Sequence, residues 1–284
     1  MTKGLIALID LDSMLHIVAA VQYAAGNRDN KNTTKQHVHR FISTICKNTG
    51  SEKVILLYQK DGHTNFRNDI LPEYKGHRVK SDAIKCWKPT IIEAFSEANA
   101  YGLQHLETDD AMSILAEHIG YKKVVLVTGD KDMAQVPTMQ YNPFKPQPRN
   151  KPKLERWNTY SIFEANAFFW MQVLAGDPTD MPNDKCGIEG VGMGKARKMC
   201  DNQENFHTII QKEYSKKYGN KEGFIRAQRT YKMVRLLKLS DLTDTYVNEA
   251  TSQEMIDLLA DVDRFTYKLG DVLSKYTDAS NLFT

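Results

Sequence analysis

Three short runs of apolar residues constrain the fold most strongly. They are Leu5–Ile9, Val54–Tyr58 and Val124–Val127, and each is apolar at every position. Uninterrupted runs of this length are typical of strands buried on both faces of a parallel sheet. Longer segments with helical spacing lie between the strands, at Met14–Ala25, Gln36–Lys47 and Asp109–Ile119. This alternation predicts an α/β fold with a mostly parallel central sheet and flanking helices.

The second half of the chain has a different pattern. After the proline-rich stretch Asn142–Pro152, strand signals become rare. Helical spacing predominates instead, at Ser161–Ala175, Asn205–Tyr218, Gly223–Leu239, Ser252–Leu259 and Asp263–Lys275. We therefore expect an α/β domain over residues 1–160 and a helical region over residues 161–284.

Composition excludes several classes of protein. The chain has 284 residues, of which 41% are hydrophobic and 26% charged, a balance that argues against wholesale disorder. No apolar run approaches the roughly 20 residues of a membrane span, and the N-terminal run is too short for a secretory signal. The four cysteines form no Cys-x-x-Cys pair, which argues against a structural zinc site or a disulfide scaffold. We expect a reduced, cytoplasmic protein without a membrane partner.

Acidic residues gather at the predicted ends of strands and helices. The nine candidates are Asp10, Asp61, Glu107, Asp109, Asp110, Asp130, Asp132, Asp177 and Asp180. Asp10 ends the first run, Asp61 lies just beyond the second, and Asp130 and Asp132 follow the third. Ligands of α/β proteins collect at the carboxyl ends of the strands, so these positions are candidates for a shared site.

Each acidic cluster also has a purely structural interpretation. Asp109 and Asp110 suit the cap of a helix, Gly129–Asp132 suits a turn, and Gly176–Asp180 suits a helix stop. If the clusters converge, however, their carboxylates would repel one another strongly unless cations held them together. Carboxylates without cysteine or histidine suit Mg²⁺ or Mn²⁺, and two such ions are a common device for cleaving phosphodiesters.

The charge balance favours a polyanionic substrate. The whole chain has a formal net charge of +3, from 38 basic and 35 acidic residues. Without the nine candidate ligands, 26 acidic residues face 38 basic ones, a balance of +12. A basic surface around an acidic, cation-holding pocket suits a nucleic acid.

A basic segment between the second and third strands is a candidate for phosphate contacts. Its candidate residues are Arg67, Tyr74, Lys75, Arg78, Lys80 and Lys85. An aromatic ring among cations suits base stacking next to phosphate contacts. A solvated helical face is the alternative interpretation of the same pattern.

A glycine-rich segment spans Gly187–Ala196. It fails as a phosphate-binding P-loop, because Glu189 stands in place of the first required glycine and Ala196 in place of the serine or threonine. It is better suited to a tight turn between two helices, whose backbone N–H groups face a DNA phosphate. We name Gly190, Gly192, Gly194 and Lys195 as candidate nucleic-acid contacts, and a purely structural turn as the alternative.

Together these motifs resemble the 5′-nuclease, or flap endonuclease, family, and especially bacteriophage 5′→3′ exonucleases and the 5′-nuclease domain of bacterial DNA polymerase I. The resemblance runs from Ile6 to about Lys198. It rests on five motifs in the family's order: Leu8–Asp10, Phe66-Arg67 with Tyr74–Arg78, Glu107–Asp110, Gly129–Asp132, and Gly176–Asp180 with the glycine segment.

The resemblance implies hydrolysis of phosphodiesters near 5′ ends by a two-metal mechanism, in replication and primer removal. It implies Mg²⁺ as the metal, replaceable by Mn²⁺, and K⁺ at the glycine hairpin. The implied partners are DNA with a 5′ flap, nick or gap, and RNA–DNA hybrids, bound by a monomer in the cytoplasm of a host cell. It also implies a helical arch, from Val79 to about Ala100, and a helix–hairpin–helix-like element.

The resemblance also implies roles for individual residues. Asp10, Glu107, Asp109, Asp130 and Asp132 match the inner metal ligands, whereas Asp110, Asp177 and Asp180 match carboxylates of the second metal position. Lys75 and Arg78 match a basic pair at the scissile phosphate, and Tyr74 matches an aromatic residue that stacks on a base.

The chain departs from the family pattern at its second strand. The family places an aspartate directly after that strand, whereas here Tyr58-Gln59-Lys60-Asp61 puts Asp61 one residue late. Asp12 is no family ligand and is interpreted as a helix cap. Two other functions stay open: a metal-dependent single-strand ribonuclease on a related fold, and a DNA-binding relative without activity.

Overall fold

The computed structural model describes residues 4–26, 31–145, 155–181, 186–201 and 205–268. Its centre is a sheet whose main path runs β3-β2-β1-β4-β5-β6. The strands are β1 (Ile6–Asp10), β2 (Lys53–Gln59), β3 (Tyr101–Leu103), β4 (Val124–Val127), β5 (Met139–Tyr141) and β6 (Trp157–Thr159). Neighbours from β3 to β5 are parallel, while β6 pairs antiparallel with β5. The mostly parallel sheet predicted from the sequence is therefore confirmed.

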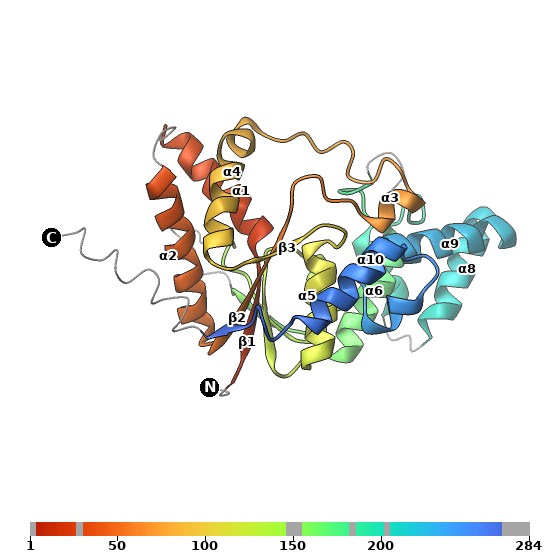
Figure 1. The fold of residues 1–284 in the computed structure, drawn as a ribbon. Helices are drawn as coiled ribbons and strands as arrows, with labels where there is room; N and C mark the ends of the chain where they lie inside the picture. Colours follow the sequence, from red (N-terminus) through yellow and green to blue (C-terminus); the bar gives the residue numbers. More distant parts are fainter. Residues whose placement is uncertain (1–3, 27–30, 146–154, 182–185, 202–204, 269–284) are drawn as a thin grey trace.

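Continuous apolar runs arise because both faces of the sheet are covered. In β2, Leu56 faces one apolar cluster and Ile55 and Leu57 face the other. Helices α1 (Leu11–Ala24), α2 (Lys31–Thr49) and α4 (Asp82–Glu97) contribute to the first cluster, and α5 (Thr108–Ile119) and α10 (Glu249–Ala260) to the second. Figure 1 shows these two sets of helices on opposite sides of the strands.

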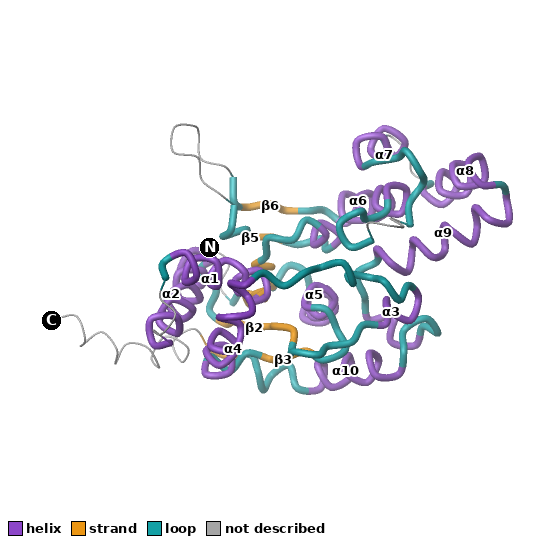
Figure 2. The backbone as a smooth tube through the Cα atoms, turned by 90° about the horizontal axis from the view of Figure 1, so that it is seen from above, coloured by secondary structure: helices purple, strands orange, loops and turns teal. Residues whose placement is uncertain are grey.

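A second helical group builds its own core next to the sheet. It contains α6 (Ile162–Ala175), α7 (Met193–Cys200), α8 (Phe206–Tyr218) and α9 (Asn220–Val234), which share a third apolar cluster. In Figures 1 and 2, α8 and α9 lie far from α2, at the opposite end of the molecule. The chain then returns to the body, because α10 packs against α5 and β7 (Tyr267–Lys268) pairs with β2. The division at residue 160 stays a prediction.

Two helix predictions need correction. The helix expected over Gly223–Leu239 ends at Val234, because the backbone of residues 235–237 forms hydrogen bonds with side chains of the sheet domain instead. The helix expected over Asp263–Lys275 is wrong in its described part, where turns lead into β7. The rest of that segment lies outside the described residues.

The segment from Leu71 to Ser81 carries the chain across the carboxyl ends of the strands. It leaves α3 (Phe66–Ile70) and reaches α4, visible as the orange trace along the top of Figure 1. The predicted arch, from Val79 to about Ala100, therefore consists of a short stretch without regular structure and then α4; we call these residues the arch segment. Trp87 and Phe95 of α4 are buried in the cluster that contains α1. Among the described residues, no helix has the length and apolar character needed to span a membrane.

Candidate metal centre and nucleic-acid interface

The first two acidic segments meet where the sheet reverses its winding direction. Strand β1 ends at Asp10, and its neighbour β4 is followed by Thr128 and Asp130. The hydroxyl of Thr128 donates a hydrogen bond of 3.0 Å to Asp10. Asp10 is also the N-cap of α1 and accepts the backbone N–H groups of Asp12 and Ser13. A switch point between neighbouring strands is the usual position of a ligand site in an α/β sheet.

The third segment is the first turn of α5. Carboxylate oxygens of Glu107, Asp109 and Asp110 lie within 4.8 Å of one another. Glu107 occupies the N-cap position, yet its side chain makes no capping hydrogen bond. Asp109 accepts the N–H of Asp110 at 2.9 Å, so one carboxylate of the three binds the backbone of this first turn.

The remaining acids complete the same pocket. Asp132, Asp177 and Asp180 line a polar cavity of about 20 Å³ together with Glu107 and Asp109. Gln172 of α6 donates to Asp132 at 2.6 Å, and Asp177 accepts the N–H of Thr179 at 2.7 Å in the turn after α6. The structure thus gathers carboxylates from three separate segments of the chain around this cavity, and Asp10 of a fourth segment is close enough to Asp130 to affect its charge.

Asp61 is not part of this group. Its carboxylate is 2.7 Å from the ammonium of Lys88 and 3.9 Å from that of Lys80, and its side chain is 65% exposed. The hydrogen bond from Lys88 lowers the pKa of Asp61. We predicted Asp61 as a metal ligand, but the residue lies in the exposed loop after β2 and faces Lys80 and Lys88 instead.

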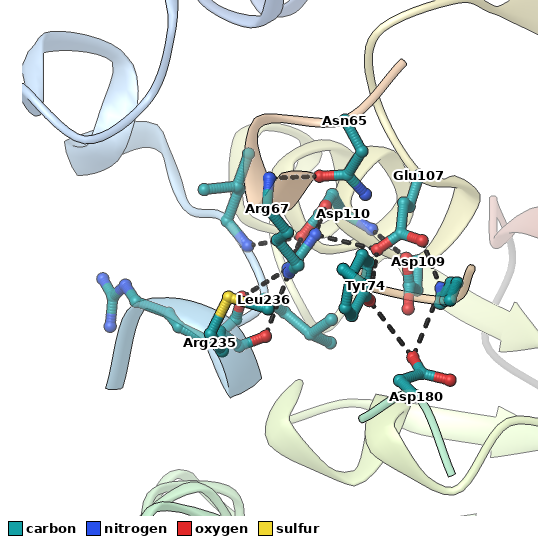
Figure 3. A network of polar contacts seen from close by, with 12 residues as sticks. Asn65, Arg67, Tyr74, Glu107, Asp109, Asp110, Asp180, Arg235 and Leu236 are labelled. Atoms are coloured by element: carbon teal, nitrogen blue, oxygen red, sulfur yellow. Dashed lines mark hydrogen bonds and ion pairs between the residues drawn. The ribbon is translucent and has the colours of Figure 1, made fainter. Parts of the chain in front are cut away.

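Arg67 is buried beneath the acidic pocket, where we expected a nucleic-acid contact. Its side chain is 2% exposed, and its five N–H groups all have partners. Nε donates to the carbonyl oxygen of Met233, Nη1 to Glu107 and Asp110, and Nη2 to Asp110 and to the carbonyl oxygen of Arg235. Figure 3 shows this network. With no donor left for a phosphate, Arg67 instead connects the end of α9 to the acids of α5.

The segment from Leu71 to Ser81, which leads to α4, contributes cations directly to the carboxylates. The ammonium of Lys75 donates to Glu107 and lies 3.4 Å from Asp180, while the guanidinium of Arg78 donates to Asp180. Lys75 has φ +56°, a left-handed conformation that is uncommon for a residue with a side chain. Its N–H donates to the carbonyl oxygen of Asp180 at 3.0 Å, which holds this conformation in place.

Tyr74 also points into the pocket. Its hydroxyl lies 3.0 Å from a carboxylate oxygen of Glu107 and 3.1 Å from one of Asp180, so these two acceptors share its single proton, and its ring is buried in the core of the helical group. Burial, followed by the charge of Glu107, raises the pKa of Tyr74, so the phenol stays protonated and acts as a donor. This buried position does not present the ring for the base stacking that we expected.

The carboxylates have unequal proton affinities. Burial alone would raise the pKa of Glu107, but the charges of Lys75 and Arg67 lower it to about 2. Burial and then the charges of Asp130 and Asp177 raise the pKa of Asp132 to about 7. Burial also raises the pKa of Asp109 and of Asp130, with further contributions from neighbouring carboxylates.

These features fit divalent cations. The donors are carboxylate oxygens, which suit Mg²⁺ and Mn²⁺, and several of them are held near one another against their mutual repulsion. A bound cation would relieve that repulsion and favour the ionised form of each acid.

Asp12 has a larger role than the predicted helix cap. Its carboxylate accepts the N–H of Gln59 at 3.0 Å and the hydroxyl of Thr108, so it joins α1 to β2 and α5. Burial and then the charge of Asp10 raise its pKa to about 7. The Leu-Ile-Asp-Leu-Asp sequence was the available signal, but only the fold shows that this second aspartate lies beside α5.

The glycine segment lies between α6 and α7. A Cβ atom on Gly187 would come within 2.3 Å of the backbone of Ala175 and Gly176, so the two chains can approach this closely only at a glycine. Gly192 is the N-cap of α7, and the ammonium of Lys195 donates to the carbonyl oxygen of Gly190 at 2.7 Å. The glycine segment therefore lies between two helices, where we expected a tight turn.

Two predicted phosphate contacts lie on the arch segment. Lys80 is 3.9 Å from Asp61, and Lys85 is 3.1 Å from Asp82. Both lysine side chains are more than half exposed, so both are accessible to a nucleic acid.

The chain is similar in sequence to several known proteins. Residues 6–164 match the family described as 5′-3′ exonuclease, N-terminal resolvase-like domain. A 5′-3′ exonuclease of Buchnera aphidicola subsp. Schizaphis graminum is 25% identical over 244 residues, which cover 81% of this chain and 83% of that protein. The flap endonuclease of Escherichia phage T5 is 24% identical over 180 residues, 57% of this chain and 60% of that protein.

Solved structures share the fold of this chain. The T5 5′-exonuclease with bound zinc ions superposes with a TM-score of 0.64 at 19% identity, covering 95% of this chain and 98% of that one. A complex of the T5 flap endonuclease with DNA and metal ions gives a TM-score of 0.59 at 16% identity, covering 90% and 99%. The chain belongs to the 5′-3′ exonuclease family and carries its N-terminal resolvase-like domain over residues 6–164.

Proposed function

We propose that this protein is a divalent-metal-dependent 5′→3′ exonuclease and flap endonuclease that hydrolyses phosphodiester bonds near 5′ ends of DNA. One observation carries the proposal. Glu107, Asp109, Asp132, Asp177 and Asp180 line one cavity, although the sequence distributes them over three segments. Membership of the 5′-3′ exonuclease family supports the same reaction.

We assign two Mg²⁺ ions to the pocket, with Mn²⁺ as a substitute. The donors would be Asp10, Glu107, Asp109, Asp110, Asp130, Asp132, Asp177 and Asp180. When bound, such ions lower the pKa of water and stabilise charge on the attacking and leaving oxygens. Asp110 already binds Arg67 through both carboxylate oxygens, so we expect it to orient its neighbours more than to hold an ion.

Lys75 and Arg78 would act on the scissile phosphate. Both cations donate hydrogen bonds to carboxylates of the pocket, and at this position they would also attract a nucleic-acid backbone. The carboxylates of Glu107, Asp109 and Asp180 raise the pKa of Lys75 even though burial opposes this, so its ammonium stays charged at neutral pH. A charged donor held at the pocket stabilises negative charge that develops on the phosphate oxygens.

The helical group would hold the duplex next to the cleavage point. The backbone N–H groups around Gly190, Gly192 and Gly194, together with Lys195, are our candidates for phosphate contacts. We also propose that K⁺ binds at this turn. The enzyme would act as a monomer, would accept RNA–DNA hybrids as substrates, and would take part in primer removal.

The test is cleavage of four labelled substrates: DNA with a 5′ flap, nicked duplex DNA, single-stranded DNA and single-stranded RNA. Each is incubated with Mg²⁺ or with EDTA. We expect Mg²⁺-dependent cleavage near the 5′ end of the flap and nicked substrates. Cleavage of single-stranded RNA without regard to a flap would favour the ribonuclease alternative. Absence of any Mg²⁺-dependent hydrolysis would favour a non-catalytic DNA-binding protein.

A further inference from the structure

One carboxylate from the C-terminal part of the chain binds the segment that leads into the acidic pocket. Glu254 of α10 accepts three consecutive backbone N–H groups, from Gln104 at 2.7 Å, His105 at 2.6 Å and Leu106 at 2.7 Å. Consecutive N–H groups that converge in this way form an anion-binding turn. Each bond is charge-assisted and therefore stronger than an ordinary backbone hydrogen bond.

Helix α10 holds this carboxylate firmly. Asn248 caps the helix by accepting the N–H of Thr251 at 2.9 Å, and Met255 and Leu258 are fully buried in the cluster shared with α5. The hydroxyl of Thr251 adds a hydrogen bond of 3.3 Å to the carbonyl oxygen of His105. The turn is therefore attached to α10 through two side chains of a packed helix.

The turn connects to the pocket in both directions. Leu106 is followed directly by Glu107, the N-cap of α5, whose carboxylate faces the pocket. Gln104 meanwhile accepts the N–H of Thr64 at 2.9 Å and donates to the carbonyl oxygen of Gly62 at 2.9 Å. Residues 62–64 lead into α3, which carries the buried Arg67.

We propose that Glu254 is a positioning residue of the metal centre: by binding the 104–106 turn it fixes Glu107. The inference rests on the proposed role of Glu107 as a metal ligand. It also gives the helix after η2 (Leu239–Thr243) a function, because α10 supplies this carboxylate from outside the 6–164 segment that matches the family. Outer residues that orient metal ligands typically change metal affinity by about 10- to 100-fold when removed.

The experiment measures Mg²⁺ affinity directly. Glu254→Ala and the matched control Glu249→Ala, an exposed glutamate on the same helix, are titrated with Mg²⁺ by calorimetry. Flap cleavage is followed in parallel as a function of Mg²⁺ concentration. We expect Glu254→Ala to need at least about tenfold more Mg²⁺ in both measurements, and the control to match the wild type.

Added formate separates positioning from a general loss of stability. The turn borders an open cavity of about 640 Å³ lined by Glu254, His105 and Tyr101, so a small carboxylate has access to the freed N–H groups. We expect formate to restore Mg²⁺ affinity in Glu254→Ala and to leave the control unchanged. Glu254→Gln, which keeps the side-chain volume, is measured alongside in case the alanine variant does not fold.

The inference is overturned if both Glu254 variants bind Mg²⁺ as the wild type does, or if formate leaves a weakened affinity unchanged. Failure of the proposed function looks different. In that case the wild type itself shows no Mg²⁺-dependent cleavage. If only the role of Glu107 as a metal ligand is wrong, Glu107→Gln keeps wild-type Mg²⁺ affinity and wild-type cleavage in the same titration.

Discussion

Arg67 and Asp110 meet in a two-pronged ion pair below the acidic pocket. Nη1 of Arg67 lies 2.6 Å from Oδ2 of Asp110, and Nη2 lies 2.9 Å from Oδ1. The same Oδ1 accepts the N–H of Leu237 at 2.9 Å, so the pair also holds the chain that follows α9. The helical group and the sheet domain are therefore joined directly beneath the candidate metal ligands.

Removing one partner of this pair will destabilise the protein. We expect Arg67→Met to lower the free energy of unfolding by about 3–5 kcal/mol, because Asp110 would keep a buried charge without its counter-ion and Glu107 would keep only Lys75. Urea denaturation of wild type and variant measures the difference. The control is Arg264→Met, at an exposed arginine 3.7 Å from Asp261, where we expect a change within about 0.5 kcal/mol. Unchanged stability together with weaker DNA binding would instead support the phosphate contact first expected of Arg67.

Asp132 is expected to matter for turnover more than for DNA binding. We expect Asp132→Asn, and likewise Asp130→Asn, to lower the cleavage rate by about 10³-fold, because a metal ion contributes several kcal/mol to transition-state stabilisation. Duplex affinity in Ca²⁺ should stay near that of wild type. Asp82→Asn, at an exposed residue of α4, is the control for loss of a negative charge. Wild-type turnover in either variant would refute the ligand assignment.

Substitutions at Lys75 and Lys80 distinguish a catalytic role from attraction of the nucleic-acid backbone. Lys75 contacts the pocket, so Lys75→Ala should lower the single-turnover rate at saturating DNA by about 10²-fold or more. Lys80 is exposed on the arch segment, so Lys80→Ala should weaken DNA binding and reduce the salt dependence of log K by about 1. If Lys75→Ala loses only affinity and keeps its single-turnover rate, Lys75 is a binding residue and not a catalytic one.

Stability without divalent ions should fall as the pH rises from about 4 to 7. Burial and neighbouring carboxylates raise the pKa of Asp132 and of Asp12 to about 7, well above the 3.8 of an unfolded aspartate. The folded protein therefore binds more protons than the unfolded chain over this range, and each proton lost weakens the folded state.

Thermal denaturation in EDTA, followed from pH 5 to pH 8, checks this sign. We expect Tm to decrease with pH in EDTA, and Mg²⁺ to raise Tm most at pH 8, where the carboxylates are ionised and bind the cation most tightly. A Tm that rises with pH in EDTA would show that these acids are already ionised at low pH.

Local pattern was sufficient for much of the architecture. The runs at Leu5–Ile9, Val54–Tyr58 and Val124–Val127 predicted three central strands, because a strand covered on both faces must be apolar at every position. Strands β3, β5, β6 and β7 were missed, since two or three residues are too short to show a period.

The sequence by itself determined which acids stand at the ends of strands and helices, because those positions follow from local spacing. Tertiary structure alone decided which of them meet. Asp61 has the right residue type and nearly the right register, yet the loop after β2 turns it towards Lys88. The sequence predicted Arg67 as a phosphate contact, but the fold buries it between the end of α9 and the start of α5. Glu254 carried no signal at all, because its partners are backbone N–H groups about 150 residues away, whose direction is set only by the fold.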